Sequence, residues 1–227
     1  PALAVYCLRA NLADPDIEIF VTPPDGADGE FRLSRTTTAA RQYGLAAAVN
    51  ATPFSPVTLF EGEACALAGL SISGATVESP PRSPYGSILF YADGRAAILT
   101  HDETLRALSA PAGITCAAGG FFVILRDGRL AREEFEGRSR SGRSPRSAVG
   151  LSSDGKNLYI VVIDGKDRDH SVGATFAETA SWLSAFGAET GLMLDGGGSS
   201  ALALADSTGR VRLVNVPVQG SLSGVER

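Results

Sequence analysis

Short apolar segments recur along the whole chain, and turn-forming residues separate them. Three Asp-Gly pairs, which begin at Asp93, Asp127 and Asp154, each lie between two apolar runs. Because Asp-Gly tolerates the positive φ angles of tight turns, each pair predicts an antiparallel hairpin. The pattern therefore predicts a sheet that is largely antiparallel.

Two other segments have helical periodicity. Thr175 and Glu178 form a capping-box pattern, in which both side chains satisfy free backbone N–H groups at a helix start. Apolar residues then recur at helical spacing as far as Gly187, which can end the helix. A shorter segment at 37–43 is followed by a glycine and an apolar strand at 45–49. We predict a helix in both segments and interpret Glu178 as a cap rather than a catalyst.

The longer helix connects two apolar strands, at 158–163 and 191–194. A strand–helix–strand unit predicts a right-handed crossover between parallel strands. Asp164 and Asp195 each follow one of these strands, so both carboxylates would emerge at the same sheet edge if the strands are neighbours. Ligands bind at that edge in open α/β sheets.

Together these elements predict an α/β (α+β) fold, with residues 1–227 as a single domain. We expect a twisted, mostly antiparallel mixed sheet with a few packed helices and one parallel strand–helix–strand unit. Of the 227 residues, 44% are hydrophobic and 20% are charged, which suits a buried core and argues against disorder. No apolar run approaches the roughly 18 residues of a membrane span. The net charge of −5 argues against binding to nucleic acid or to an anionic membrane.

The most informative stretch for chemistry follows the last of these strands: Asp195-Gly196-Gly197-Gly198-Ser199-Ser200. Three consecutive glycines are costly in backbone entropy, so they suit a loop that approaches a ligand closely or presents N–H groups to an anion. A flexible hairpin tip is the alternative. The position after an apolar strand, with an aspartate at the exit, favours a binding site.

Four arginines, Arg138, Arg140, Arg143 and Arg146, lie close together without an intervening acid. A guanidinium can bind a phosphate through two parallel hydrogen bonds. We expect Arg138 and Arg140 to lie in a solvated loop. Arg146 opens the strand at 147–151 and is the best candidate for a phosphate ligand, with a surface ion pair as the alternative.

Metal and cysteine chemistry have weaker support. His101 and His170 have no metal-spaced companion, and we expect both in loops. The three cysteines form no C-x-x-C pair and are interpreted as small buried hydrophobic residues. No cofactor is demanded, although Asp164 and Asp195 offer oxygen ligands of the kind that Ca²⁺ or Mg²⁺ prefers.

In its order of motifs, the chain resembles the phosphodiester glycosidase family, which includes bacterial proteins related to exopolysaccharides. The matching elements span about residues 114–201, and they are Gly119-Gly120, Arg146-Ser147-Ala148-Val149-Gly150, Asp164-Gly165, Gly173-Ala174-Thr175 with Glu178, and the run from Asp195 to Ser200. Nearer the N-terminus, Asn50 and Phe54 match two positions of the family's Asn-Gly-x-Phe-Phe element, while Ala51 and Pro53 depart from it.

The resemblance implies hydrolysis of a sugar 1-phosphodiester, such as one of N-acetylglucosamine, to free sugar and a phosphomonoester. On this hypothesis Asp195 is the base or nucleophile and Asp164 is its partner. The predicted ligands of the sugar and the phosphate are Asn50, Gly120, Arg146, Thr175, Gly196, Gly197, Gly198 and Ser199. The family also implies a phosphorylated glycan as partner and an extracytoplasmic location.

Two alternatives stay open. The chain could be a module that binds phosphoglycans or polysaccharides without turnover, which the departures near Asn50 would allow. It could also be an enzyme of polysaccharide assembly that acts on a related phospho-sugar. The sequence leaves the oligomeric state open.

Overall fold

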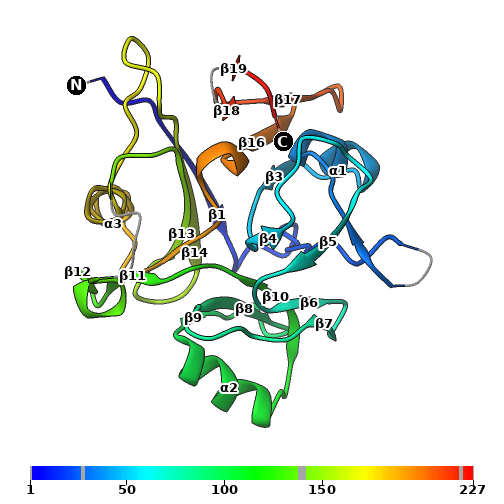
Figure 1. Ribbon diagram of the computed structural model, residues 1–227. Coiled ribbons are helices and arrows are strands. Elements are labelled where there is room, and N and C mark those ends of the chain that lie inside the picture. The colour runs from blue at the N-terminus through cyan, green and yellow to red at the C-terminus, as the bar shows by residue number, and fades with distance from the viewer. Residues whose placement is uncertain (1, 27–28, 138–141, 220–221, 227) are drawn as a thin grey trace.

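The computed structural model describes residues 2–26, 29–137, 142–219 and 222–226, and the strand pairs among these residues are all antiparallel (Figure 1). The mostly antiparallel α+β fold predicted from the sequence is therefore confirmed. The largest sheet has six strands in the order β1 (Val5–Asn11), β14 (Asn157–Ile163), β13 (Arg146–Leu151), β15 (Thr190–Met193), β11 (Val123–Arg126) and β12 (Arg129–Leu130).

The three predicted Asp-Gly hairpins are present. They connect β13 to β14, β11 to β12, and β8 (Ser87–Tyr91) to β9 (Ala96–Leu99). At the tip between β11 and β12, Asp127 has φ 50° and Gly128 has φ 69°. Both central residues thus have positive φ, the conformation that made Asp-Gly a hairpin signal.

The strand–helix–strand unit differs from the prediction in one respect. β14 and β15 run in the same direction, but β13 lies between them and pairs antiparallel with both. Asp164 and Asp195 therefore leave the sheet at the same edge, as predicted, although their strands are not neighbours. The antiparallel Asp154 hairpin explains the difference, because it places β13 directly beside β14.

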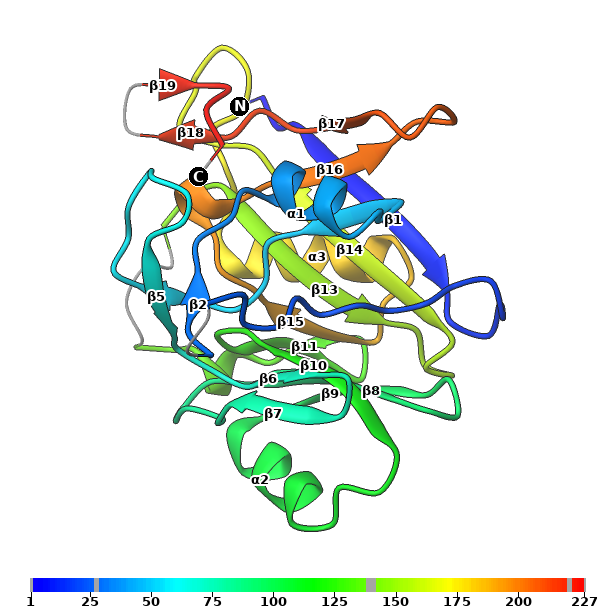
Figure 2. The same ribbon diagram turned by 90° about the vertical axis from the view of Figure 1, so that its right-hand side faces the viewer.

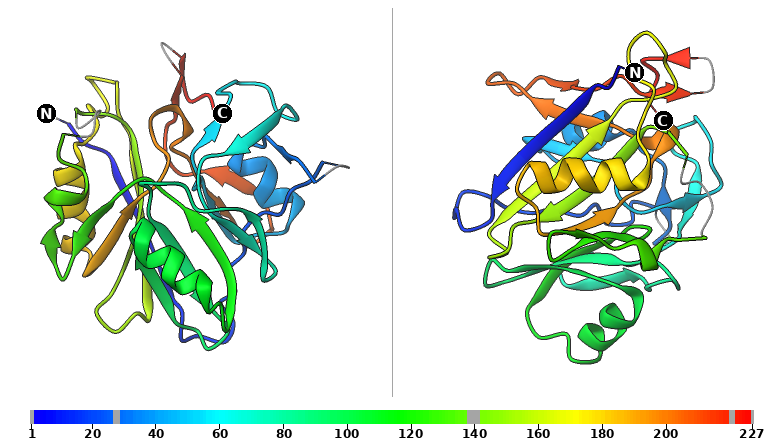
Figure 3. Two further views of the ribbon diagram at one scale, coloured as in Figure 1. Left: turned by 60° about the horizontal axis from the view of Figure 1, so that its bottom comes forward. Right: turned by 90° about the vertical axis from the view of Figure 1, so that its left-hand side faces the viewer.

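The six-stranded sheet is covered on both faces (Figure 3). α3 (Phe176–Ala185) lies across one face, where Phe176 and Leu183 are buried against the sheet. On the other face Leu158 and Leu192 pack against Phe90 of a second sheet. That second sheet has the order β7 (Thr76–Ser79), β6 (Ser71–Ser73), β10 (Ile114–Gly119), β8 and β9. The apolar core between the two sheets supports the edge from which Asp195 emerges.

A helix that the sequence analysis missed, α2 (His101–Ser109), packs on the second sheet through Ala107 and Leu108 (Figure 1). His101 is therefore helical, and its predicted loop position is wrong. The signal was a second capping box, because Thr100 accepts the Glu103 N–H and the Glu103 side chain accepts the Thr100 N–H. Of the helices in the described ranges, none is long and apolar enough to cross a membrane.

The rest of the chain forms smaller sheets beside the large one (Figure 2). α1 (Thr36–Gln42) packs through Ala40 on a three-stranded sheet. Its own N-cap, Arg35, makes no side-chain capping bond, but the Glu226 carboxylate accepts the Thr37 N–H at 2.8 Å and its hydroxyl at 2.6 Å. The remaining elements are β17 (Val211–Leu213), β16 (Leu202–Ala205) and β3 (Ala47–Val49) in that sheet, β2 (Phe31–Arg32), β5 (Ala64–Leu67) and β4 (Phe54–Ser55) in another, the pair β18 (Val218–Gln219) and β19 (Leu222–Ser223), and the 3-10 turns η1 (Arg132–Glu134) and η2 (Gly197–Ser199).

The capping box of α3 generates a prediction about pH. A hydrogen bond from the Thr175 N–H, more than any other cause, lowers the pKa of the Glu178 carboxyl below its usual value of 4.5. The stabilisation by the charged carboxylate is thus complete above that pH and is lost as pH falls through the lowered pKa. Near pH 7, Glu178→Gln should lower the free energy of unfolding by about 0.3–1 kcal/mol, a Tm difference of about 1–4 °C.

Thermal unfolding of the wild type and Glu178→Gln from neutral pH to about pH 3 checks this. The Tm difference should shrink below about pH 4.5, whereas Glu133→Gln, at an exposed position in η1, should leave Tm unchanged throughout. A constant difference across the range would contradict the role of the Glu178 charge.

Candidate active site

Asp195 is held in place through its backbone. Its N–H donates to the Ala51 carbonyl at 2.9 Å, and its carbonyl accepts from the Asn50 side-chain amide at 2.7 Å. The preceding residue, Leu194, donates its N–H to the Ser147 carbonyl at 2.9 Å. These bonds fix the backbone of Asp195 at the sheet edge. The residue is half-buried, so it keeps partial access to solvent.

The side chain of Asn50 connects three segments that are distant in sequence. Besides the bond to Asp195, its Oδ1 accepts the Ser147 hydroxyl at 2.7 Å and the Ala201 N–H at 3.1 Å. Both ends of the amide are therefore engaged within the protein. This favours a positioning role for Asn50 over the direct contact with substrate predicted from the sequence.

The glycine run forms a tight turn rather than a flexible hairpin tip. Gly197 has φ 61° and donates its N–H to the Pro145 carbonyl at 2.9 Å, while the N–H groups of Ser199 and Ser200 bond within the turn. A Cβ on Gly198 would collide with the Gln219 side chain, which donates to the Gly198 carbonyl. The glycines are thus needed both for a left-handed conformation and for close approach.

Unsatisfied hydrogen-bond donors gather beside Asp195. Within the described ranges, no acceptor bonds the N–H groups of Gly196 and Gly198. Ser200 is fully buried. Among the described residues, its hydroxyl is one of two buried side-chain polar atoms without a hydrogen-bond partner. The N–H groups of Gly196 and Gly198 are half-buried, so they are donors that an anion at this turn could accept.

Asp164 has a different environment from the one predicted. It is 1% exposed, and its carboxylate accepts the Val216 N–H at 3.1 and 3.0 Å and the Asn215 amide at 2.9 Å. His170 Nε2 lies 2.8 Å from Asp164 Oδ2. A buried carboxylate whose oxygens already accept protein donors is poorly placed for substrate, so Asp164 fits a positioning role better than the predicted catalytic one.

The charge of Asp164 also affects Tyr6. Burial, followed by the Asp164 charge and a hydrogen bond to it, raises the pKa of the Tyr6 hydroxyl. The phenol therefore stays protonated and donates to the carboxylate. Together with His170, which lies in a loop as predicted, Tyr6 completes the shell around Asp164.

Two residues that the sequence analysis did not identify connect these groups. Asn215 donates to Asp164 and, at 2.9 Å, to the Ser200 carbonyl, and its Oδ1 accepts the Leu202 N–H at 2.8 Å. Gln219 holds the Gly198 carbonyl from the other side. Neither lies in a recognisable motif, and their positions follow only from the tertiary fold.

Three other predicted ligands are occupied in building the structure. Arg146 is 6% exposed, donates to the Ala174 carbonyl at 2.9 Å and the Gly142 carbonyl at 2.5 Å, and stacks 4.6 Å from the Phe176 ring. Burial lowers its pKa to about 10, so it stays largely cationic at neutral pH. These contacts hold the guanidinium between two backbone carbonyls and the Phe176 ring, which favours a structural role over the predicted phosphate contact.

The Thr175 hydroxyl is the helix cap of α3, and a Cβ on Gly120 would collide with the Met193 carbonyl. Both residues thus have structural roles that account for their identity. Arg138 and Arg140, which were expected in a solvated loop, lie outside the described residues.

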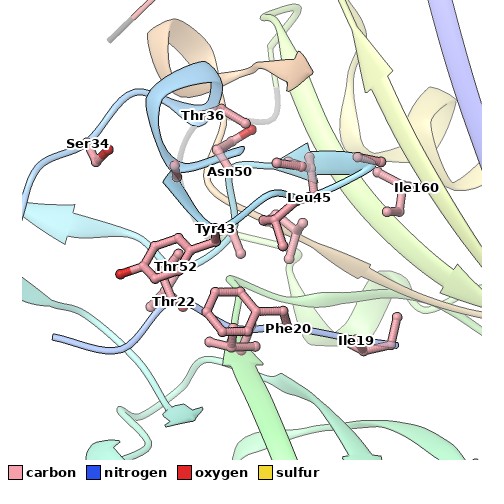
Figure 4. A pocket seen from close by; sticks show the side chains of 18 of the residues that line it. Ile19, Phe20, Thr22, Ser34, Thr36, Tyr43, Leu45, Asn50, Thr52 and Ile160 are labelled. Carbon is pink, nitrogen blue, oxygen red and sulfur yellow. The ribbon is translucent and has the colours of Figure 1, made fainter. Parts of the chain in front are cut away.

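A cavity of about 780 Å³ reaches the site, and Asp195 and Ser199 are among its lining residues. Asn50 lines it as well (Figure 4). The charged residues that line it are Arg9, Asp14, Glu18, Asp25, Arg32, Glu61 and Asp195, and all of them except Asp195 are exposed. Among the described residues, Asp195 is therefore the one charged group of the lining that is withdrawn from the rim. A half-buried carboxylate beside free N–H donors can act on a substrate that carries both an electrophilic carbon and an anion.

No group of three or more His, Cys, Asp or Glu side chains within the described ranges is arranged to hold a metal ion. The cysteines are all free thiols. Cys116 is buried, as predicted for a small hydrophobic residue, and burial raises its pKa to about 11. Cys7 is exposed, so the same interpretation is wrong for that residue.

Residues 43–227 match the family model of the phosphodiester glycosidases. The match covers most of the chain, and the protein therefore belongs to the phosphodiester glycosidase family. No curated protein matches the chain by sequence.

Solved structures share the fold at low sequence identity. The catalytic domain of zebrafish N-acetylglucosamine-1-phosphodiester alpha-N-acetylglucosaminidase, auto-inhibited by its pro-peptide, is similar with a TM-score of 0.65 and 18% identity, over 96% of this chain and 76% of that one. A candidate exported protein from Burkholderia pseudomallei has a TM-score of 0.60 and 15% identity over 95% and 71% of the two chains. A hypothetical protein from Synechocystis has a TM-score of 0.56 and 18% identity over 92% and 56%.

The contacts of Asp164 predict a loss of stability on substitution. Asp164→Asn turns one of the two acceptor oxygens into an NH₂ donor. In one orientation this NH₂ group faces the N–H groups of Val216 and Asn215, and in the other it faces His170. Because an unsatisfied buried group costs about 1–3 kcal/mol, Tm should fall by at least about 3 °C.

Thermal unfolding checks this, with Asp169→Asn as the matched control, because Asp169 lies in the same loop and is exposed. The control should unfold like the wild type. An unchanged Tm for Asp164→Asn would refute the positioning role assigned to this carboxylate.

Proposed function

We propose that the protein hydrolyses a sugar 1-phosphodiester to the free sugar and a phosphomonoester, with Asp195 at the reacting centre. The observation that carries the proposal is the placement of Asp195 beside unpaired donors. It is the withdrawn carboxylate of the cavity lining, its backbone is fixed on both sides, and the next turn presents the free N–H groups of Gly196 and Gly198. Membership of the phosphodiester glycosidase family supports the same reaction.

The reaction breaks the bond between the anomeric carbon and the phosphate oxygen. The phosphate leaves with the bonding electron pair, and the oxygen of water is finally bonded to the anomeric carbon. A phosphomonoester is a weak base, so the strong general acid of ordinary glycosidases is less necessary. Asp195 would either take the proton of the attacking water or attack the carbon itself and stabilise its positive charge.

The turn after Asp195 would bind the phosphate. The backbone N–H groups of Gly196 and Gly198 are fixed donors, and donors that need no reorganisation are the most effective at stabilising a developing anion. We do not count Arg146 among the phosphate ligands, because its guanidinium contacts the Ala174 carbonyl and the Phe176 ring. Asp164 would act indirectly, because Asn215 couples it to the Ser200 carbonyl.

N-acetylglucosamine is the sugar that the zebrafish relative's name supplies, and we propose a similar substrate here. The similarity to a candidate exported protein supports an extracytoplasmic location, where a phosphorylated glycan could serve as substrate.

The decisive experiment follows sugar release from an N-acetylglucosamine-α-1-phosphodiester. Wild type should release the sugar, and Asp195→Asn should lower kcat by at least about 1,000-fold, because it removes the group that acts in the transition state. The backbone bonds of Asp195 do not need the carboxylate, so thermal unfolding of the variant, measured alongside, shows whether the fold is kept.

Asp169→Asn should be fully active, which makes it the matched control for this substitution as well. Undiminished activity of Asp195→Asn would overturn the assignment. If the wild type binds the phosphodiester without releasing sugar, the protein is a phosphoglycan-binding module. If the wild type transfers the sugar to an acceptor other than water, it is an assembly enzyme.

A further inference from the structure

The cavity beside Asp195 has walls of an unusual character for a carbohydrate site. Leu45, Ile19 and Ile160 face it from three different segments (Figure 4), and Ile160 belongs to the face of β14 opposite α3. The charged side chains of the lining are exposed apart from Asp195, so they lie at the rim. The interior between the rim and the site is therefore largely apolar.

Exposed apolar side chains gather at the same cavity. Seven large hydrophobic residues in the described ranges are exposed, and four of them line this cavity: Ile17, Phe20, Leu59 and Phe60. Phe60 is 71% exposed, the highest value of the seven. Exposed apolar residues that cluster at one opening mark a binding surface, whereas scattered ones need no explanation.

The volume suits an apolar ligand larger than a single ring. At about 780 Å³, the cavity is several times larger than the roughly 150 Å³ apolar space that holds one benzene molecule. Water in such a space finds few polar partners, so a hydrocarbon would replace it favourably. Phe60 and Asp195 line the same cavity, so a chain attached to a phosphate beside Asp195 could extend into it.

We propose that this cavity binds the hydrocarbon chain of the substrate, so that the phosphodiester joins a sugar to an apolar alcohol. The inference rests on the proposed function, because it takes the reacting phosphate to lie beside Asp195. The sugar would then occupy the solvent side of the glycine turn, and the chain would extend between Ile160 and Leu45 toward Phe60. Recognition of the chain depends on apolar area rather than on hydrogen bonds, so chain length should control affinity.

The test compares three N-acetylglucosamine-α-1-phosphodiesters that carry methyl, octyl or citronellyl groups, each below its micellar concentration. Each methylene that leaves water strengthens binding about fourfold, so three buried methylenes should raise kcat/KM for the octyl ester about 60-fold over the methyl ester. The ratio of the octyl and citronellyl values distinguishes a straight alkyl chain from a branched isoprenoid chain.

Two variants locate the effect. Phe60→Ser at the rim and Ile160→Thr in the wall should each lower the octyl-to-methyl ratio at least about threefold, while kcat/KM for the methyl ester stays within about twofold of the wild type. Val77→Ser is the matched control, because Val77 is 55% exposed but lies outside the cavity lining. It should leave the ratio unchanged.

The outcomes separate this inference from the proposed function. If all three esters are hydrolysed with equal kcat/KM, or if Val77→Ser lowers the ratio as much as Phe60→Ser, the hydrocarbon site is refuted and the hydrolase stands. If none is hydrolysed, the hydrolase is refuted, and calorimetry of the same esters decides the site. Tighter binding of the octyl ester that Phe60→Ser weakens would support it, and equal binding of the methyl and octyl esters would refute it.

Discussion

The side-chain amide of Asn50 is the constraint on which the candidate site depends. It bonds the Ser147 hydroxyl, the Asp195 carbonyl and the Ala201 N–H, so one residue fixes the start of β13, the exit of β15 and the start of β16 relative to one another. An amide can serve all three because it combines two acceptor lone pairs with two donors. Aspartate in its place would lose the bond to Asp195, and leucine would lose all three. The separate small sheet carrying β3 is thereby joined to the edge of the large one.

A second polar centre supports the same edge from the opposite side. The Asp164 carboxylate holds Val216 and Asn215, and Asn215 in turn holds the Ser200 carbonyl and the Leu202 N–H. The turn from Gly196 to Ser200 thus lies between two networks of buried hydrogen bonds. Buried networks of this kind rigidify a site because each unsatisfied member is costly. The rigidity leaves the N–H groups of Gly196 and Gly198 pointing where the described part of the chain offers no acceptor.

Local signals in the sequence were sufficient for much of the fold. The Asp127-Gly128 hairpin and the Thr175–Glu178 cap depend on residues that are adjacent or three apart, so a short segment of sequence is enough to predict their geometry. The same cap at Thr100 and Glu103 was overlooked, although the signal was present. The roles of Arg146 and Asn215 could not be inferred in this way. Their partners lie 28 and 51 residues distant, and only the assembled sheet shows that Arg146 is enclosed by backbone carbonyls and Phe176.

The bond between Glu226 and Thr37 joins the first helix of the chain to its last described residue. During synthesis, α1 emerges from the ribosome long before its capping carboxylate exists, and a seven-residue helix without a cap is marginal on its own. Thr36 and Ala39 of this helix line the cavity. The two large sheets can therefore assemble first, whereas this part of the cavity wall is completed only when the segment that carries Glu226 is in place. A change near Glu226 would therefore disturb the opening of the cavity, which residues far away in the sequence form.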